Sequence, residues 1–289
     1  MRNAYFKGHG LGNDYIALDP GELDFGLTPK SVRAICDRHR GIGGDGILAL
    51  EPSERAHFGL RIYNPDGSEA EKSGNGLRIF ASYLFATRRT RRKKFRIETP
   101  GGIVGVELHV DGNGDASRVT AVMGHASFRP GRLPCTLEVP ELVDRPIHAA
   151  GRNLRFTGVS VGNPHCVVFK RPGDGWTRDE LLALGPALEG HEIFPKRINV
   201  QLAVPTGPRA LSISIWERGV GETLASGTSA CAAAAAGIRL GLVRSPVAVL
   251  APGGALEVAV DEHFDLTLDG EVAEVARGRL SSAFIRTLG

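Results

Sequence analysis

The sequence predicts an α+β protein of two pseudo-symmetric halves, each a curved, mainly antiparallel, β-barrel-like sheet around a central helix. Two observations support this fold class: landmarks recur along the chain at nearly one spacing, and strand-like segments outnumber helical ones. With 289 residues, the chain is long enough for two ordinary domains.

Four pairs of landmarks recur in the same order, with offsets between 150 and 153 residues. They are Gly12-Asn13 with Gly162-Asn163, residues 58–63 with 211–216, Ser73-Gly74 with Ser226-Gly227, and residues 100–102 with 252–254. One such coincidence would be weak, but four in one order indicate two homologous halves with similar folds.

Each half contains a strand, a turn, a serine and a helix. "FGLRIY" and "LSISIW" alternate apolar with other residues, as half-buried strands do, and each ends ten residues before its serine. "FRIETPGGIVGVELHV" and "VAVLAPGGALEVAV" are typical of β-hairpins that turn at Pro-Gly-Gly. Helical patterns cover residues 29–39, 75–87, 178–184 and 230–240.

The composition, with 42% hydrophobic and 23% charged residues, indicates a soluble globular protein. The net charge of +3 comes largely from the basic run 88–94, which we interpret as a solvated connector rather than a nucleic-acid site. Cys36, Cys135, Cys166 and Cys231 are scattered, which argues against a disulfide framework or a zinc site. Without a signal-peptide core or a long apolar run, we expect a cytoplasmic protein with no membrane partner.

Ser73 and Ser226 are each placed to cap the start of a helix, with small residues following. The first N–H groups of a helix lack intrahelical partners and carry partial positive charge, so both starts suit a carboxylate or a phosphate. If the repeat brings both starts to one cleft, the two side chains would face opposite sides of the carbon next to a bound carboxylate. That arrangement suits inversion of this carbon, which needs a base on one face and an acid on the other.

Ordinary capping explains either serine alone, and the duplication is what favours a shared site. Asparagine and arginine side chains near strand ends suit the amino and carboxylate groups of a polar small molecule, although each asparagine could also belong to a turn. The polar residues near the two starts are His9, Asn13, Asp14, Asn64, Asn163, His165, Arg197, Asn199, Glu217 and Arg218.

Several segments resemble diaminopimelate epimerase in order and spacing. They are "HGLGND", "DRHRGIGGDG", "NPDGSEAEKSGNGLR", "VGNPHCVVF", "RINV" and "WERGVGETLASGTSAC". The resemblance covers nearly the whole chain and implies two similar α/β halves with the last strand returning to the first. We therefore expect an N-terminal lobe of residues 1–120 with 276–289, a C-terminal lobe of residues 121–275, and an active site in the cleft between them.

The resemblance also implies an isomerase that works without a metal or another cofactor and is usually a homodimer. Its expected substrate is diaminopimelate, converted between the L,L and meso forms for lysine biosynthesis, with no nucleic-acid partner. Residues expected to bind the substrate are Asn13, Asn64, Gly74, Asn75, Asn163, Asn199, Glu217, Arg218, Gly227 and Thr228.

The family resemblance implies cysteines, a thiolate base and a thiol acid, at the two positions where this chain has Ser73 and Ser226. A helix start can lower a thiol pKa from about 8.5 until the group is substantially ionised at neutral pH. A serine hydroxyl ionises many pH units higher, so unaided serine should not remove an α-proton at a useful rate. We expect Ser73 and Ser226 at the acid/base positions, with His165 and Glu217 as proton-transfer helpers.

Three explanations of the serines remain open. They are a double Cys→Ser change made to trap a substrate complex, a natural paralogue with altered isomerase chemistry or another carboxylate substrate, and a catalytically silent amino-acid-binding paralogue. Ile79, where the family commonly has cysteine, and Ser229, where glycine is usual, argue against the first.

Overall fold

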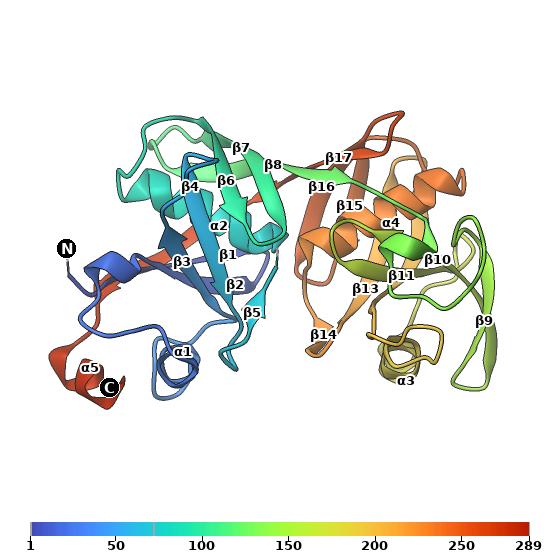
Figure 1. The fold of residues 1–289 in the computed structure, drawn as a ribbon. Coiled ribbons are helices and arrows are strands. Elements are labelled where there is room, and N and C mark those ends of the chain that lie inside the picture. The colour runs from blue at the N-terminus through green and yellow to red at the C-terminus, as the bar shows by residue number, and fades with distance from the viewer. Residues whose placement is uncertain (1, 72, 289) are drawn as a thin grey trace. The chain divides into compact units, whose positions relative to one another are not determined.

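The computed structural model describes residues 2–71 and 73–288, and the chain divides into two compact units (Figure 1). The first unit comprises Met1–Val122 and Gly270–Gly289, and the second comprises Met123–Asp269. The chain passes from one unit to the other within strands β8 (Ala116–His125) and β17 (Asp265–Glu271).

In the first unit, a curved sheet packs around helix α2 (Gly74–Ala86), which contacts β1, β2, β7 and β18. The strands pair in the order β18-β1-β2-β3-β4-β6-β7-β8, with β5 beside β4. All neighbours are antiparallel except β2–β3 and β4–β6. The bounds are β1 Ala4–Gly10, β2 Asn13–Leu18, β3 Ile47–Glu51, β4 Phe58–Tyr63, β5 Glu69–Ala70, β6 Lys94–Thr99, β7 Gly102–Val110 and β18 Ala273–Arg279.

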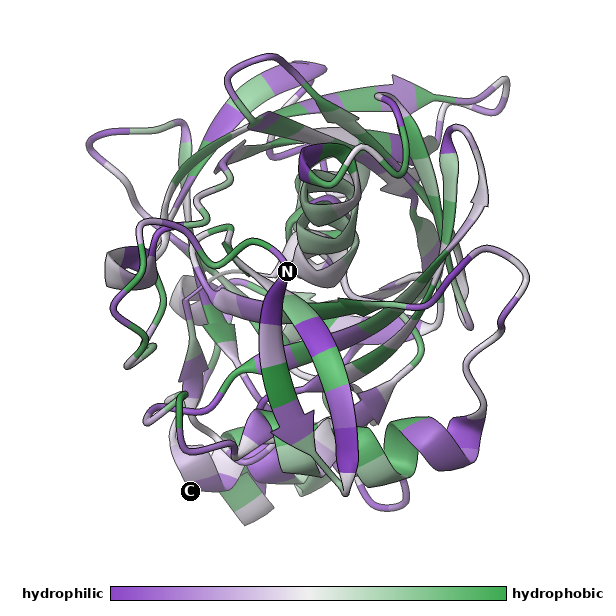
Figure 2. Cartoon of the chain, turned by 90° about the vertical axis from the view of Figure 1, so that its right-hand side faces the viewer, coloured by the Kyte–Doolittle hydropathy of each residue, from purple (hydrophilic) through white to green (hydrophobic). Residues whose placement is uncertain are grey.

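The second unit repeats this plan around helix α4 (Gly227–Arg239), which Figure 2 shows inside a ring of strands. Its strands pair in the order β9-β10-β11-β12-β13-β15-β16-β17, with β14 beside β13 and only β11–β12 and β13–β15 parallel. The bounds are β9 Arg145–Ala149, β10 Arg152–Ser160, β11 Pro164–Phe169, β12 Asn199–Gly207, β13 Ala210–Glu217, β14 Gly221–Thr223, β15 Val247–Ala251 and β16 Gly254–Val260.

The sheets and the enclosed helices of the two units match, which confirms the predicted fold class. Their parallel strand pairs fall at equivalent places, and helices α2 and α4 both have 13 residues. Even the register agrees, because Ile16 pairs with Ile47 in the first unit and Cys166 pairs with Val200 in the second. These partners are offset by 150 and 153 residues, as the sequence landmarks are.

Side-chain size lets a helix sit inside each sheet. The five alanines Ala232–Ala236 of α4 have no exposed surface, and alanine combines the highest helix propensity with a very small side chain. Helix α2 instead fills its sheet with Leu77, Phe80 and Leu84, which are also fully buried. A helix that is apolar on every side has to be enclosed in this way.

The four predicted helices are present, with different ends. Helix α1 (Pro29–Cys36) is shorter than expected because Asp37 turns the backbone into an extended conformation. Helix α3 (Arg178–Glu189) starts at a capping box formed by Thr177 and Glu180 and runs past its expected end at 184. Helix α5 (Ser282–Leu288) was not predicted. Within residues 2–71 and 73–288, no helix has the length and apolar character of a membrane span.

Candidate active site

The start of α2 is built around Ser73, whose backbone is extended at φ −138° and ψ 121°. Its Oγ accepts a hydrogen bond from the backbone N–H of Gly76 at 3.0 Å. The phenol oxygen of Tyr15 lies 3.4 Å from the same Oγ. Gly74 and Asn75 follow the cap and are buried. The Ser73 hydroxyl therefore already serves as a helix cap, as expected for serine at this position.

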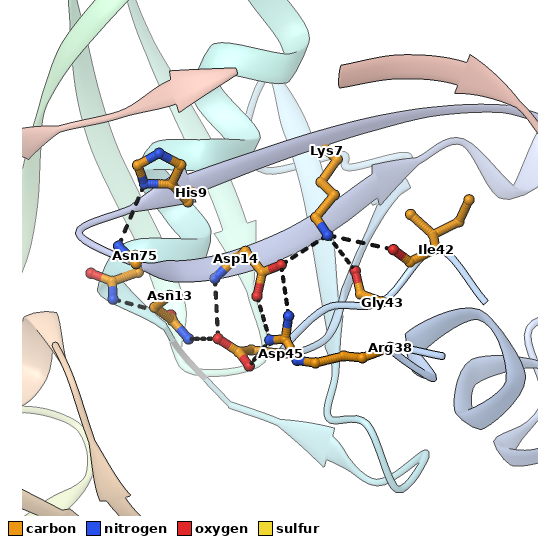
Figure 3. A network of polar contacts seen from close by, with 10 residues as sticks. Lys7, His9, Asn13, Asp14, Arg38, Ile42, Gly43, Asp45 and Asn75 are labelled. Atoms are coloured by element: carbon orange, nitrogen blue, oxygen red, sulfur yellow. Dashed lines mark hydrogen bonds and ion pairs between the residues drawn. The ribbon is translucent and has the colours of Figure 1, made fainter. Parts of the chain in front are cut away.

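Two asparagine side chains link this helix start by hydrogen bonds to the loop before β3 (Figure 3). Asn75 accepts from Arg78 Nη2 at 2.7 Å and donates through Nδ2 to Asn13 Oδ1 at 3.0 Å. Asn13 in turn donates through Nδ2 to Asp45 Oδ2 at 2.8 Å. Because each amide is bonded through both its oxygen and its nitrogen, its orientation is fixed. The ring of His9 accepts a hydrogen bond from the backbone N–H of Gly12 through Nδ1 at 3.4 Å.

A charged cluster holds this part of the site in place. Arg38 Nη2 lies 2.7 Å from Asp14 Oδ1 and 2.7 Å from Asp45 Oδ1, and Lys7 Nζ lies 3.0 Å from Asp14 Oδ2. Burial alone would raise the pKa of Asp14, but hydrogen bonds and charge from Arg38 and Lys7 hold it below its ordinary value. The cluster therefore fixes the loop that orients Asn13.

Asn64, which we expected to bind the substrate, lies in the turn after β4. Its N–H donates to the Ser68 carbonyl at 2.8 Å, and its Nδ2 donates to Ser68 Oγ at 3.0 Å. Gly67 N–H returns to the Asn64 carbonyl at 2.9 Å. These bonds all lie within one turn, whereas Ser73, Asn75 and Asn13 belong to one connected group around the helix start.

The start of α4 has the same backbone form, with Ser226 at φ −148° and ψ 123°. Its hydroxyl, however, makes no capping hydrogen bond within the described part of the chain and lies 3.5 Å from Thr228 Oγ1. The Ser226 residue is 8% exposed. The two helix starts therefore share their geometry but differ in how the hydroxyl is used.

Asn163 and His165 lie beside this second start. Asn163 Nδ2 donates to Thr228 Oγ1 at 3.4 Å, and its Oδ1 lies 2.9 Å from His165 Nε2. Since an amide oxygen only accepts, Nε2 carries the proton. His165 is fully buried, and burial lowers its pKa from 6.5 to about 3. A neutral imidazole is therefore linked to Ser226 through Asn163 and Thr228.

Glu217 is the last residue of β13, and Arg218 follows it in the turn toward β14. Glu217 Oε1 accepts from Thr223 Oγ1 at 2.8 Å across the β13–β14 hairpin, and the Arg218 side chain is exposed. Asn199 donates through Nδ2 to the Pro164 carbonyl at 2.8 Å and accepts the Arg218 N–H through Oδ1 at 3.0 Å. Its amide thus ties the start of β11 to the Arg218 loop.

Sequence reasoning missed two residues of these surroundings. Glu189 is 5% exposed, and its carboxylate accepts from Trp216 Nε1 and from the Gly219 N–H, both at 2.8 Å. Nothing local in the sequence indicates these long-range bonds. Tyr15 was also missed, although its offset from His165 is 150 residues, the same as that between Gly12-Asn13 and its repeat.

None of the four cysteines stands at either helix start. Cys36, Cys166 and Cys231 are buried, and burial raises the pKa of the Cys36 thiol to about 12. Cys135 is partly exposed, and its thiol pKa is also raised by burial. These thiols therefore do not replace the missing pair. No three His, Cys, Asp or Glu side chains among residues 2–71 and 73–288 are grouped to hold a metal ion.

Solved structures of epimerases and racemases share this fold. A hydroxyproline epimerase from Agrobacterium vitis has a TM-score of 0.71 at 16% identity, over 96% of this chain and 92% of that one. A probable proline racemase from Agrobacterium radiobacter K84 has a TM-score of 0.70 at 14% identity, over 96% and 93%. This chain therefore shares the fold of these two proteins.

The diaminopimelate epimerase family matches residues 5–129 and 157–275. Diaminopimelate epimerase 2 of Nostoc sp. is 42% identical over 281 residues, which cover 96% of this chain and 95% of that protein. The diaminopimelate epimerase of Leptospira biflexa is 35% identical over 281 residues, covering 97% and 99%. The chain belongs to the diaminopimelate epimerase family, as its sequence segments indicated, and it is an isomerase.

Proposed function

We propose that this isomerase inverts the α-carbon of diaminopimelate, interconverting its L,L and meso forms, with one substrate molecule held by the starts of both α2 and α4. The observation that carries the proposal is the duplicated helix start. Each unit by itself places a serine, a glycine and buried backbone amides at the start of its enclosed helix. The names of relatives at 35–42% identity support the choice of substrate.

The helix starts supply the electrostatic part of the reaction. The N–H groups of the first helical turn and the helix dipole favour the reacting carboxylate, and they favour it more as enolate-like charge develops after proton removal. Gly74 and Asn75 would supply these groups in the first unit, and Gly227 and Thr228 in the second. Ser73 and Ser226 would then face the α-carbon from opposite sides as the two halves act as lobes around one cleft.

The serines make turnover slower than a thiol pair would. The Ser73 hydroxyl is already bonded to the Gly76 N–H, and the imidazole behind Ser226 is neutral and buried. Glu217, a half-buried carboxylate at the end of β13 that accepts a hydrogen bond from Thr223 Oγ1, would accept a proton in the second unit. We therefore expect intact binding and slow exchange of the α-proton.

Substrate recognition would come from both units. The exposed guanidinium of Arg218 suits the distal carboxylate, because a planar fork binds a carboxylate through two parallel hydrogen bonds. Asn13, Asn64 and Asn163 offer amides for the polar groups of the substrate, and Asn199 holds the Arg218 backbone. The homodimer that the family resemblance implies and the cytoplasmic location expected from the sequence are part of the same proposal.

A catalytically silent amino-acid-binding protein is the second candidate. The Ser73 hydroxyl favours it, because its role as a helix cap is complete without any reaction. An isomerase for another carboxylate substrate would share the same anion-binding helix starts.

Deuterium exchange separates these candidates. The protein and the Ser73→Cys/Ser226→Cys variant are incubated with L,L-diaminopimelate in deuterium oxide, and α-deuterium and the meso product are followed by NMR. We expect slow exchange by the unaltered protein and inversion at least about 100-fold faster in the double variant. Thermal stabilisation by the substrate without exchange in either protein would favour the binding protein. Neither binding nor exchange in either protein would contradict diaminopimelate as the ligand.

A further inference from the structure

Tyr15 is held with its phenol at the start of α2. It lies on β2, is 8% exposed, and brings its oxygen to 3.4 Å from Ser73 Oγ. Its ring packs on the backbone of Gly46, where a Cβ atom would lie 2.8 Å from the ring carbon Cε1. Gly46 has a φ of 158°, and a Cβ there would also come within 2.4 Å of the Tyr63 carbonyl oxygen. A glycine at position 46 therefore makes room for the ring and fixes its place.

The internal repeat makes Tyr15 the counterpart of His165. Ile16 pairs with Ile47 in the parallel β2–β3 pair, and Cys166 pairs with Val200 in the parallel β11–β12 pair. The residues just before Ile16 and Cys166 are Tyr15 and His165, so the two side chains occupy equivalent places in their units. Each unit thus has a titratable group on the strand next to its helix start.

We propose that Tyr15 is a proton-relay residue for Ser73, a role that rests on the proposed function and extends it. When the α-C–H bond of the substrate breaks, its electron pair stays on the substrate as an enolate stabilised at the helix start. The proton goes to Ser73 Oγ, and the original hydroxyl proton of Ser73 passes to the phenolate oxygen of Tyr15. The reverse transfers return a proton to the α-carbon.

The phenol supplies what the serine lacks. A tyrosine phenol ionises near pH 10 in water, far closer to neutral pH than a serine hydroxyl. The relay also makes the two half-sites unlike each other. The first unit would use an ionised phenol, whereas the buried imidazole of His165 remains neutral at the same position of the second unit.

The test measures α-deuterium incorporation into diaminopimelate between pH 6 and pH 10, with Ser226→Ala present so that only the first unit can exchange. We expect the rate to rise about tenfold per pH unit below the phenol pKa and to fall at least about 100-fold at pH 9 in Tyr15→Phe. Tyr15→Phe keeps the ring on Gly46. The matched control is Tyr5→Phe, which removes a phenol from β1 and should leave the pH profile unchanged.

A rescue experiment separates relay from packing. With Ser73→Cys, the thiol can form its own thiolate, so adding Tyr15→Phe should change the exchange rate less than about threefold. An unchanged pH profile in Tyr15→Phe would overturn the relay. So would the absence of exchange at pH 9 in the parent protein while Ser73→Cys/Ser226→Cys inverts the substrate, a result that leaves the proposed function standing. If that double variant is also inactive and binds no diaminopimelate, the proposed function fails and the relay fails with it.

Discussion

Ser73 Oγ accepts the backbone N–H of Gly76 at 3.0 Å, whereas the equivalent Ser226 makes no such bond within the described residues. The two serines share a backbone conformation and a place in the repeat, so the difference lies in the side chains. One hydroxyl stabilises its helix, and the other lies beside the Thr228 hydroxyl. The Ser73 hydroxyl therefore has a structural role as a helix cap, whereas the Ser226 hydroxyl has no such role among the residues that the structure describes.

Removing each hydroxyl should therefore affect stability unequally. Ser73→Ala loses a helix cap and should lower the free energy of unfolding by about 1 kcal/mol. Ser226→Ala loses no capping bond and should change it by less than about 0.5 kcal/mol. Urea unfolding of both variants beside the parent protein measures the difference. Equal losses would show that the cap at Ser73 does not stabilise α2.

His165 should make stability depend on pH. Its pKa is lowered by burial from 6.5 to about 3, so the unfolded state binds more protons between these values and stability falls as pH is lowered through them. His165 should contribute up to about 1.4 kcal/mol per pH unit to the slope of the unfolding free energy against pH. Comparison with His165→Gln in urea unfolding at pH 4 and pH 7 should show a flatter dependence in the variant. In NMR, a His165 imidazole that titrates above pH 5 would contradict the expectation.

Glu189 should act on substrate affinity through the Arg218 loop. Glu189→Gln keeps the side-chain size but leaves a single acceptor oxygen for the two donors, Trp216 Nε1 and Gly219 N–H. We expect diaminopimelate binding to weaken about tenfold, measured by calorimetry, since loss of a hydrogen bond to a charged group is worth about 1.5–3 kcal/mol and part of it is recovered by rearrangement. Glu192→Gln, at an exposed site three residues along, is the matched control and should bind as the parent does.

Asp45 should affect substrate binding because it orients the side chain of Asn13. In Asp45→Asn, the new amide can place only one oxygen where the carboxylate accepted from Asn13, Arg38 and the Asp14 N–H. We expect diaminopimelate binding to weaken about fivefold, with unfolding free energy lowered by less than about 1 kcal/mol because Asp45 is partly exposed. Asp115→Asn, in the exposed turn between β7 and β8, should change neither. Unchanged affinity in Asp45→Asn would show that Asn13 keeps its orientation without the carboxylate.

The two helix starts could be predicted because the pattern that marks them is local. It consists of a serine, small residues and an apolar helical pattern, and it occurs in both halves of the chain. The fold class followed from the same duplication. The contacts of Asp45 with Asn13 and of Glu189 with Trp216 could not be predicted, because they join residues 32 and 27 positions apart and depend on which strands become neighbours. Short helix α5 escaped prediction because seven residues carry little periodicity.

Side-chain roles were harder to predict than residue positions. Asn199 and Asn64 were expected to face a ligand, since asparagine at a strand end suits polar recognition. In the structure, both amides bond within the protein, to Pro164 and Arg218 in one case and to Ser68 in the other. Residue type and position alone do not distinguish an amide that binds a ligand from one that holds a loop. Their roles in substrate binding therefore remain predictions.

The alanine run Ala232–Ala236 limits where this protein can diverge. With no exposed surface on any of the five methyl groups, a bulkier residue anywhere along the run would push the helix away from the surrounding strands. New substrate preferences would therefore have to arise in the loops around the helix start, while the helix itself stays nearly invariant in size. The enclosed helix would therefore tolerate few substitutions, whereas the loops around its start could vary.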